Sequence, residues 1–379
     1  MIKRLIQPQL KADLEKKILI LSGPRQSGKT TLSKSLFDNY DYFSFDDGDD
    51  RLKILKKEWN RTTPLLILDE IHKMKNWKSF LKGIFDKEGV RPRILVTGSA
   101  KMTAFKKAGD SLAGRHLNFR LHPFDLKELK ESKFKLSLED SYLRLQTVGG
   151  FPEPFLSGKK NDYNRWRRSH LDLILRQDAF DLEVIRDISS LETLIHLLSE
   201  RVGSTVSTAN LARQLSKDPK TIQKWISLLE NLFVIFKISP YHQNISRSLK
   251  KEPKYYFYDS GLVRGDESQK LENIVACALL KEAHYLEDVL GYNVSLNFLR
   301  TKDGREIDFF IEVQDKNCWL IEVKLGDSDI SPHFKSFSSH FKNVRQVQIV
   351  KNLKREFSNE QGVEVKKALP WLSELNLVN

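Results

Sequence analysis

Cysteine is scarce in this sequence, and long hydrophobic runs are missing. The two cysteines, Cys277 and Cys318, cannot form a disulfide framework, so we expect a reducing, cytoplasmic location. Apolar runs such as residues 65–68 are far shorter than the roughly 18 residues that a membrane span needs. The apolar stretch at the N-terminus is also too short for a secretory signal. We therefore expect neither a disulfide-stabilised secreted domain nor a membrane protein.

Acidic residues are also in short supply relative to basic ones. The 379 residues include 63 Lys and Arg against 50 Asp and Glu, which gives a formal net charge of +13. Hydrophobic residues make up 40% and charged residues 30% of the chain, which is typical of a globular protein and argues against disorder. The length corresponds to two or three domains. The positive excess suggests a polyanionic partner.

The order of apolar and helical patterns indicates an α/β fold. In the first 120 residues, strand-like runs alternate with helical stretches, which predicts a parallel sheet with crossover helices. From about residue 125 to residue 188 the pattern is helical, and we interpret it as a helical lid. The expected strands of the first part span residues 18–22, 42–45, 65–68, 94–97 and 117–121.

A glycine-rich motif follows the first expected strand. Residues 23–30 fit the pattern G-x-x-x-x-G-K-[ST], in which glycines let backbone N–H groups surround phosphates, Lys29 reaches the β- and γ-phosphates and Thr30 binds Mg²⁺. The motif predicts an ATP site with Mg²⁺. Its expected nucleotide-binding residues are Gly23, Pro24, Arg25, Gln26, Ser27, Gly28, Lys29, Thr30 and Thr31.

Two further apolar strands end in polar residues suited to the same site. The run Leu-Leu-Ile-Leu before Asp69 and Glu70 predicts that Asp69 completes magnesium binding and that Glu70 orients the attacking water. The strand that starts near Arg93 ends at Thr97, Gly98 and Ser99, where a hydroxyl would lie beside the γ-phosphate. A solvated or capped strand end is the alternative interpretation of each pattern.

Together with Leu-Ala-Gly-Arg at residues 112–115, these motifs resemble a prokaryotic group of AAA+ ATPases whose C-terminal domain is commonly related to PD-(D/E)xK nucleases. The resemblance implies Walker A roles for Lys29 and Thr30 and Walker B roles for Asp69 and Glu70. It implies sensor 1 at Ser99, with Thr97 as the alternative. Arg115 resembles an arginine finger that completes a neighbouring subunit's site, with Arg120 as second choice. Sensor 2 candidates are Arg165, Arg167 and Arg168.

Residues 190–262 carry three helical patterns followed by two β-rich runs, an order typical of a winged helix. The segment resembles DNA-binding winged helices, in which Thr221, Gln223 and Lys224 would face the groove. The ribbon between residues 234 and 258 adds basic side chains suited to phosphate contacts. These are Arg247, Lys250, Lys251 and Lys254. A protein-interaction module is the alternative.

The last hundred residues predict two adjacent strands that carry acids near their ends. Asp308 and Glu322 could share a divalent metal, and Lys324 could hold a water or stabilise developing charge. This block resembles the PD-(D/E)xK nuclease fold, and Glu272 matches the acid that this family often carries on its first core helix. Loss of catalysis, with the fold retained for DNA grip or oligomerisation, is the alternative.

These observations define one overall expectation. We expect an α/β chain with a P-loop AAA+ core (residues 1–124), a helical lid (125–189), a winged helix (190–262) and a restriction-endonuclease-like α/β domain (263–379). It would use ATP and Mg²⁺ to remodel or translocate DNA, as a homo-oligomer and most simply a hexameric ring. Metal-dependent nuclease activity of the C-terminal domain is a further expected activity. The alternatives are a motor that remodels branched DNA without cleaving it, and a signalling or defence ATPase that controls a protein partner.

Overall fold

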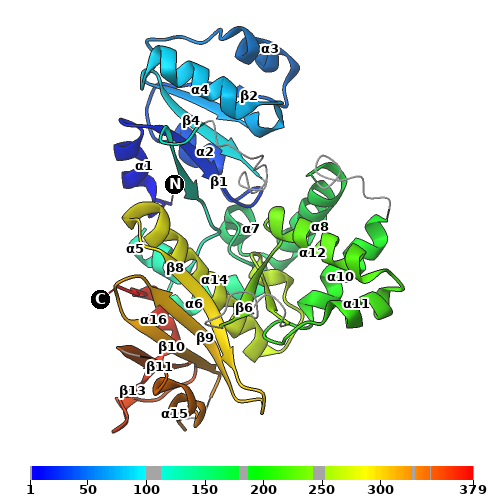
Figure 1. Cartoon of the computed structure of the whole chain (residues 1–379), viewed down its shortest axis with the longest axis vertical. Helices are drawn as coiled ribbons and strands as arrows, with labels where there is room; N and C mark the ends of the chain where they lie inside the picture. The colour runs from blue at the N-terminus through cyan, green and yellow to red at the C-terminus, as the bar shows by residue number, and fades with distance from the viewer. Residues whose placement is uncertain are drawn as a thin grey trace. The chain divides into compact units, whose positions relative to one another are not determined.

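The computed structural model describes residues 2–99, 112–132, 134–178, 187–241, 252–326, 329–341 and 343–378. The chain forms two compact units. The first comprises residues 1–122 with 231–233, and the second comprises residues 123–230 with 234–379. Each unit has its own sheet, and the two sheets have different strand orders (Figure 1).

A parallel five-stranded sheet forms the centre of the first unit. Its strand order is β2-β3-β4-β1-β5, and every neighbouring pair is parallel. The central strands are buried on both faces, which explains their continuous Leu, Ile and Val runs. All five predicted strands are present. Their observed bounds are Ile18–Ser22 (β1), Asp41–Ser44 (β2), Leu65–Asp69 (β3), Arg93–Gly98 (β4) and His116–Arg120 (β5).

Helices connect these strands and cover the sheet. Helix α4 packs Trp77, Leu81 and Ile84 into the same apolar cluster as Leu66 and Val96. The alternation of strand and helix therefore produces the crossover arrangement that the sequence predicts. The helices described in this unit are α1 (Gln7–Asp13), α2 (Lys29–Lys34), α3 (Gly48–Lys56), η1 (Ile71–Lys73) and α4 (Trp77–Glu88).

An eight-stranded mixed sheet runs through the second unit. Its order is β12-β13-β11-β10-β9-β8-β6-β7, with parallel pairing at β13-β11, β11-β10 and β8-β6. Both strands of the predicted nuclease-like block are present as an antiparallel pair, β9 and β10. The strands are β6 (Ile235–Pro240), β7 (Lys254–Phe257), β8 (Val294–Arg300), β9 (Glu306–Val313), β10 (Cys318–Lys324), β11 (Val344–Val350), β12 (Phe357–Ser358) and β13 (Val363–Lys367).

Helices precede and cover this sheet. The longest of them, α14 (Glu267–Leu290), begins with a capping box at Asp266 and Gln269 and packs along β7 and β8. The others described are α5 (Leu126–Glu131), α6 (Leu138–Val148), α7 (Pro152–Ser157), α8 (Lys160–Leu173), η3 (Ile174–Asp178), α10 (Ile188–Ser199), α11 (Thr208–Leu215), α12 (Pro219–Asn231), η4 (Ser260–Leu262), α15 (His333–Ser338) and α16 (Ala368–Ser373).

The strand pairing joins the segments on either side of one expected domain boundary. Three helices, α10 to α12, and the antiparallel pair β6-β7 follow one another as the winged-helix prediction requires. However, β6 also pairs with β8 through Ser239–Asn297 and Pro240–Phe298. A division between residues 262 and 263 would therefore cut one continuous sheet into two, because hydrogen bonds join its strands across that point.

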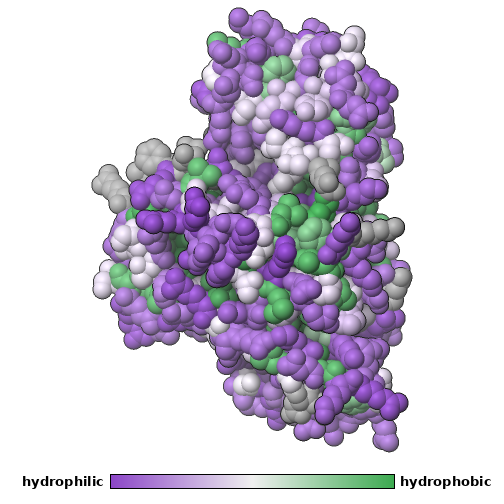
Figure 2. Space-filling model, turned by 180° about the vertical axis from the view of Figure 1, so that it is seen from behind, coloured by the Kyte–Doolittle hydropathy of each residue, from purple (hydrophilic) through white to green (hydrophobic). Residues whose placement is uncertain are grey.

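The surface agrees with the composition. Seen from behind, most visible side chains are hydrophilic, as expected for a chain with 30% charged residues (Figure 2). Within the described ranges, no helix has the length and apolar character needed to cross a bilayer. Cys277 and Cys318 are both free thiols.

Candidate functional site

The glycine-rich motif forms the loop between β1 and α2. Gly23 has a φ of 153°, and a Cβ there would lie 2.3 Å from the carbonyl oxygen of Leu121, so only glycine fits. Gly28, with a φ of 95°, begins α2 in the left-handed conformation. Both glycines are therefore required by backbone geometry, as the phosphate-loop prediction assumes.

Lys29 is the first residue of α2, and its side chain reaches back into this loop. Its buried ammonium donates to the carbonyl oxygens of Gly23 at 2.9 Å and Pro24 at 2.7 Å. The loop is also supported from the N-terminal segment, because the buried guanidinium of Arg4 donates to the carbonyls of Ser27 at 2.9 Å and of His122. Nothing in the sequence around Arg4 signals this contact, so sequence reasoning missed it.

Asp69 is held by three hydroxyl groups from three other elements. The Tyr42 hydroxyl donates to Asp69 Oδ2 at 2.7 Å, the Thr30 hydroxyl lies 3.3 Å from the same oxygen, and the Thr97 hydroxyl donates to Oδ1. Parallel strand pairing explains this convergence, because β3 and β4 end side by side with Asp69 opposite Thr97. Burial, followed by the contact with Asp69, raises the pKa of Tyr42.

Glu70 follows Asp69 in an unusual backbone conformation. Its φ of 55° is rare for a residue other than glycine, and its backbone N–H donates to the Thr97 carbonyl at 2.9 Å. The Ser99 hydroxyl donates to Glu70 Oε2 at 3.3 Å. The turn therefore directs Glu70 toward Ser99. The two sensor 1 candidates contact different acids, because Ser99 contacts Glu70 and Thr97 contacts Asp69.

His72 is a further residue of this site that sequence reasoning passed over. Its Nδ1 lies 3.5 Å from Glu70 Oε2 in a buried position on η1. Burial and then the charge of Lys73 lower the pKa of His72 to about 4, so the ring is neutral at pH 7 and adds no full positive charge beside Glu70. The sequence feature that could have identified His72 is its position two residues after Glu70.

Arg115 lies outside this cluster. Its guanidinium forms a two-point ion pair with Asp86 of α4, with Nε–Oδ1 at 2.6 Å, and it also donates to the Ala113 carbonyl. The side chain is 33% exposed. Within one chain the structure thus assigns Arg115 a partner on α4, and an arginine-finger role would require this ion pair to open.

The donor set of the first unit suits a magnesium nucleotide. Lys29 supplies a positive charge within the loop, and Thr30 and Asp69 supply the hydroxyl and carboxylate oxygens that Mg²⁺ prefers. Glu70 adds a carboxylate that can accept a hydrogen bond from water. The arrangement can therefore bind a nucleotide phosphate chain and position a water molecule against it.

A second cluster of charged residues lies in the second unit. Asp308 on β9 accepts a hydrogen bond from the backbone N–H of Val323 at 2.9 Å, and Lys324 pairs with Glu322 at 2.8 Å. Burial and the neighbouring charge of Glu322 raise the pKa of Asp308 to about 6. The predicted Asp308, Glu322 and Lys324 therefore do come together.

The position of Lys254 differs from the one predicted for the basic ribbon. The sequence predicts that it contacts phosphates from the surface, but its side chain is only 1% exposed and pairs with Glu306 at 2.6 Å and Glu272 at 3.3 Å. Burial alone would lower the pKa of Lys254, but Glu272, Asp308 and Glu306 raise it above its ordinary value. The three half-buried acids therefore stabilise the buried ammonium of Lys254 in its charged form. Arg247, Lys250 and Lys251 lie outside the described residues.

Of the three acids that the sequence predicts to bind a metal in this unit, Asp308 and Glu322 suit a shared cation and Glu272 does not. Glu322 Oε2 is buried without a hydrogen-bond partner, which suits a cation beside Glu322 and Asp308. Glu272 does not fit, because the ammonium of Lys254 and the hydroxyl of Tyr256, at 2.7 Å, already engage its carboxylate. Among the residues that the structure describes, no group of three His, Cys, Asp or Glu side chains has metal-binding geometry.

Known families match the chain in three consecutive parts. Residues 15–130 match the AAA domain family, residues 139–266 match a "Domain of unknown function (DUF8612)" and residues 268–371 match a "Domain of unknown function (DUF4143)". The AAA match and the C-terminal match support an AAA-type ATPase group. The AAA match includes the whole Lys29, Asp69 and Glu70 cluster.

Several curated relatives are uncharacterised proteins. One from Haemophilus influenzae is 23% identical over 392 residues and covers 94% of each chain. One from Mycobacterium tuberculosis is 25% identical over 309 residues, covering 79% of this chain and 68% of the relative. A third, from Methanocaldococcus jannaschii, is 24% identical and covers 92% of this chain and 83% of the relative.

Two solved structures show weak similarity. A DNA replication initiation factor is 20% identical with a TM-score of 0.30, and it covers 59% of this chain and 86% of its own. A signal transduction ATPase from Pyrococcus horikoshii is 12% identical with a TM-score of 0.23, covering 76% of this chain and 48% of its own.

Proposed function

We propose that this chain is an AAA+ ATPase that couples ATP hydrolysis to the remodelling or translocation of DNA. The observation that carries the ATPase part is the convergence of Thr30, Asp69 and Glu70 beside the Lys29 loop. The net charge of +13 and the helix-turn-helix formed by α11 and α12 support DNA as the partner. On α12, Gln223 and Lys224 are exposed and Thr221 is half-buried.

Each residue of the site has a defined task in this proposal. Lys29 would neutralise phosphate charge, and Mg²⁺, when bound near Thr30 and Asp69, would supply further positive charge to the phosphate chain. Thr30 offers a hydroxyl ligand to the metal, and the hydroxyl groups of Tyr42 and Thr97 keep the Asp69 carboxylate in place. The Glu70 carboxylate accepts a hydrogen bond from the attacking water. The hydrogen bond from the Ser99 hydroxyl fixes the orientation of Glu70.

Stimulation of ATP hydrolysis by DNA tests the proposed function. We expect linear duplex, single-stranded or four-way-junction DNA to raise the steady-state ATPase rate of the purified full chain. Lys29→Ala is the control, because it removes the phosphate counter-charge and should abolish the rate with and without DNA. An ATPase rate that no DNA substrate changes would contradict DNA as the partner and would favour a signalling ATPase.

A second candidate activity is metal-dependent DNA cleavage in the second unit. Cleavage is favoured by the buried Oε2 of Glu322, which has no hydrogen-bond partner and lies next to Asp308. The ammonium of Lys254 beside Glu272 favours a motor that does not cleave. Denaturing gels with Mg²⁺ or Mn²⁺ distinguish the two. Nicked strands with wild type and Lys29→Ala, but not with Asp308→Ala, would support cleavage. Intact strands throughout would support the motor alone.

A further inference from the structure

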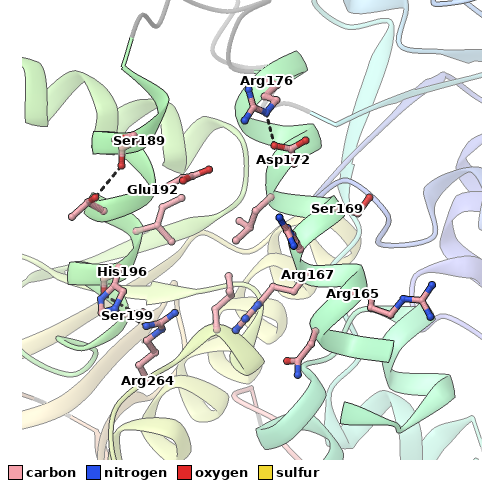
Figure 3. A pocket seen from close by; sticks show the side chains of 16 residues that line it. Arg165, Arg167, Ser169, Asp172, Arg176, Ser189, Glu192, His196, Ser199 and Arg264 are labelled. Carbon is pink, nitrogen blue, oxygen red and sulfur yellow. Dashed lines mark hydrogen bonds and ion pairs between the residues drawn. The ribbon is translucent and has the colours of Figure 1, made fainter. Parts of the chain in front are cut away.

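An arginine-rich groove lies between α8 and α10 in the second unit (Figure 3). Its volume is about 1280 Å³, and it is lined by residues of α8, η3, α10, η4 and the segment after η4. Two of the lining residues are acids, Asp172 and Glu192. Five are arginines, and we call the site the arginine groove after them: Arg165, Arg167, Arg168, Arg176 and Arg264.

The helix that carries three of these arginines is held by an aromatic cluster on its other face. Tyr163, Trp166 and His170 are buried, and the ring of Trp166 stacks on His170 at a centroid distance of 4.5 Å. Phe151 packs against Trp166 at 5.1 Å. Because these contacts prevent α8 from rotating, its arginines are presented on a rigid support rather than on a loose surface helix.

Most of the positive charge in the groove is not neutralised. Asp172 pairs with Arg176 at 2.5 Å, so it is already engaged. Across the described ranges, no acidic side chain forms an ion pair with Arg165 or Arg168, and both are exposed. Arg264 contacts the ring of His196 on α10. The groove therefore presents several guanidinium groups against one remaining acid, Glu192.

The placement of the arginines suits a row of phosphates better than a single anion. In Figure 3, Arg167 and Arg264 approach the groove from opposite sides, whereas Arg165 extends from the other flank of α8. Guanidinium groups donate two parallel hydrogen bonds to phosphate oxygens. The two groove-facing arginines on opposite walls, together with the exposed lining residue Arg168, can contact successive phosphates of a nucleic-acid backbone.

We propose that the arginine groove binds the phosphodiester backbone of DNA. This inference rests on the proposed function and assigns its DNA contact to α8, α10 and Arg264. Contacts made to phosphates carry no base information, so binding is insensitive to sequence. Each phosphate contact releases counter-ions, so affinity falls steeply as salt is added.

Charge reversal on the two walls of the groove tests the inference. Fluorescence anisotropy with labelled single-stranded and duplex oligonucleotides of unrelated sequence measures the affinity. Arg168→Glu and Arg264→Glu should each weaken binding, and the double variant Arg168→Glu/Arg264→Glu should weaken it roughly tenfold or more for every sequence. The slope of log affinity against log salt should shrink for the double variant by about 1.4 for single strands and about 1.8 for duplex.

A matched control separates the groove from general charge. Lys354→Glu/Arg355→Glu changes the net charge by the same amount at exposed positions outside the groove, and it should bind DNA like wild type. Thermal unfolding of every variant shows that the fold is retained. Wild-type affinity in either groove variant would overturn the inference.

DNA-binding measurements on the wild-type chain and on α12 variants distinguish failure of the groove from failure of DNA binding as a whole. If Lys220→Glu/Lys224→Glu on α12 abolishes DNA binding while the groove variants bind normally, the groove inference fails and the DNA function stands. If the wild-type chain binds no DNA at low salt, the proposed DNA function fails as well. If the groove variants lose ATP affinity but keep DNA affinity, the arginines serve the nucleotide and the inference is wrong.

Discussion

At the scale of single residues, the nucleotide site depends on how firmly its two acids are held. Asp69 receives hydrogen bonds from Tyr42 and Thr97, and Glu70 is positioned by Ser99 and by its own left-handed turn. Hydrogen bonds to charged groups contribute about 1.5–3 kcal/mol each. Removing one donor should therefore reduce activity measurably without unfolding the sheet.

Thr97→Val tests this support, since valine keeps the shape of threonine but removes the hydroxyl donor to Asp69. We expect kcat/KM for Mg·ATP hydrolysis to fall by roughly 10- to 150-fold, which corresponds to the loss of one charge-assisted hydrogen bond. Nucleotide binding measured without magnesium should change little. Thr62→Val, at an exposed position of the same unit, is the control. Unchanged hydrolysis in Thr97→Val would show that Asp69 does not depend on this donor.

Asp259 makes the stability of the second unit depend on pH. Burial raises the pKa of Asp259 from 3.8 to about 7, although hydrogen bonds from Tyr163 and the Gly261 backbone N–H oppose the shift. The folded state then binds more protons than the unfolded state between these values, so stability falls as pH rises from about 4 to 7.

Asp259→Asn should remove this dependence because the amide does not titrate. Compared with wild type, we expect its free energy of unfolding to be similar near pH 4 and to be higher above pH 7, by about 4 kcal/mol at most. Urea unfolding at several pH values measures the difference. A constant difference between the two proteins across this pH range would show that Asp259 is not the titrating group.

At the scale of elements, Lys254 joins three parts of the second unit. It lies on β7 and pairs with Glu272 of α14 and Glu306 of β9, next to Asp308. Lys254→Met should leave these half-buried acids without their cation and destabilise the unit by about 3 kcal/mol. Chemical unfolding followed by circular dichroism measures this loss.

Lys237→Met on the adjacent strand β6 is the matched control for this prediction. Lys237 is exposed, so the same substitution there should change stability by less than about 0.5 kcal/mol. Equal effects of the two substitutions would contradict the role of Lys254 as an internal counter-ion.

The elements differ in how far the sequence predicts them. Strands β1 and β3 could be predicted to within one residue because a buried strand in a parallel sheet needs a continuous apolar run, and polar residues mark its end. Lys254 could not be placed in this way. A lysine close to other basic residues in the sequence is typical of an exposed ribbon. Only the three-dimensional structure shows that Lys254 is buried and forms ion pairs with acids of β9 and α14. The contacts of Asp69 with Tyr42 and Thr97 likewise depend on strand order.

At the scale of the whole molecule, Arg115 provides a test of assembly. If it acts on the site of a neighbouring subunit, Arg115→Ala should bind ATP nearly normally but hydrolyse it slowly. The substitution also removes the ion pair with Asp86, whose exposed position makes its effect on stability small. ATP binding and turnover of the purified variant measure the two effects separately.

Mixing two inactive variants tests whether the finger acts between subunits. Arg115→Ala combined with Lys29→Ala should restore part of the ATPase rate, because mixed oligomers contain sites with an intact loop from one chain and an intact arginine from another. Absence of rescue under conditions where subunits exchange would argue that Arg115 serves only its own chain.

The most direct measurement of the central claim is the ATP hydrolysis rate of Glu70→Gln, taken together with its ATP affinity. The glutamine keeps the size of the side chain but removes the carboxylate that orients the attacking water. The proposed site predicts that this variant binds ATP like wild type and hydrolyses it at least about 100-fold more slowly. Hydrolysis by Glu70→Gln at the wild-type rate would contradict the assignment of Asp69, at the end of β3, and Glu70, directly after it, as the magnesium-binding and water-orienting acids.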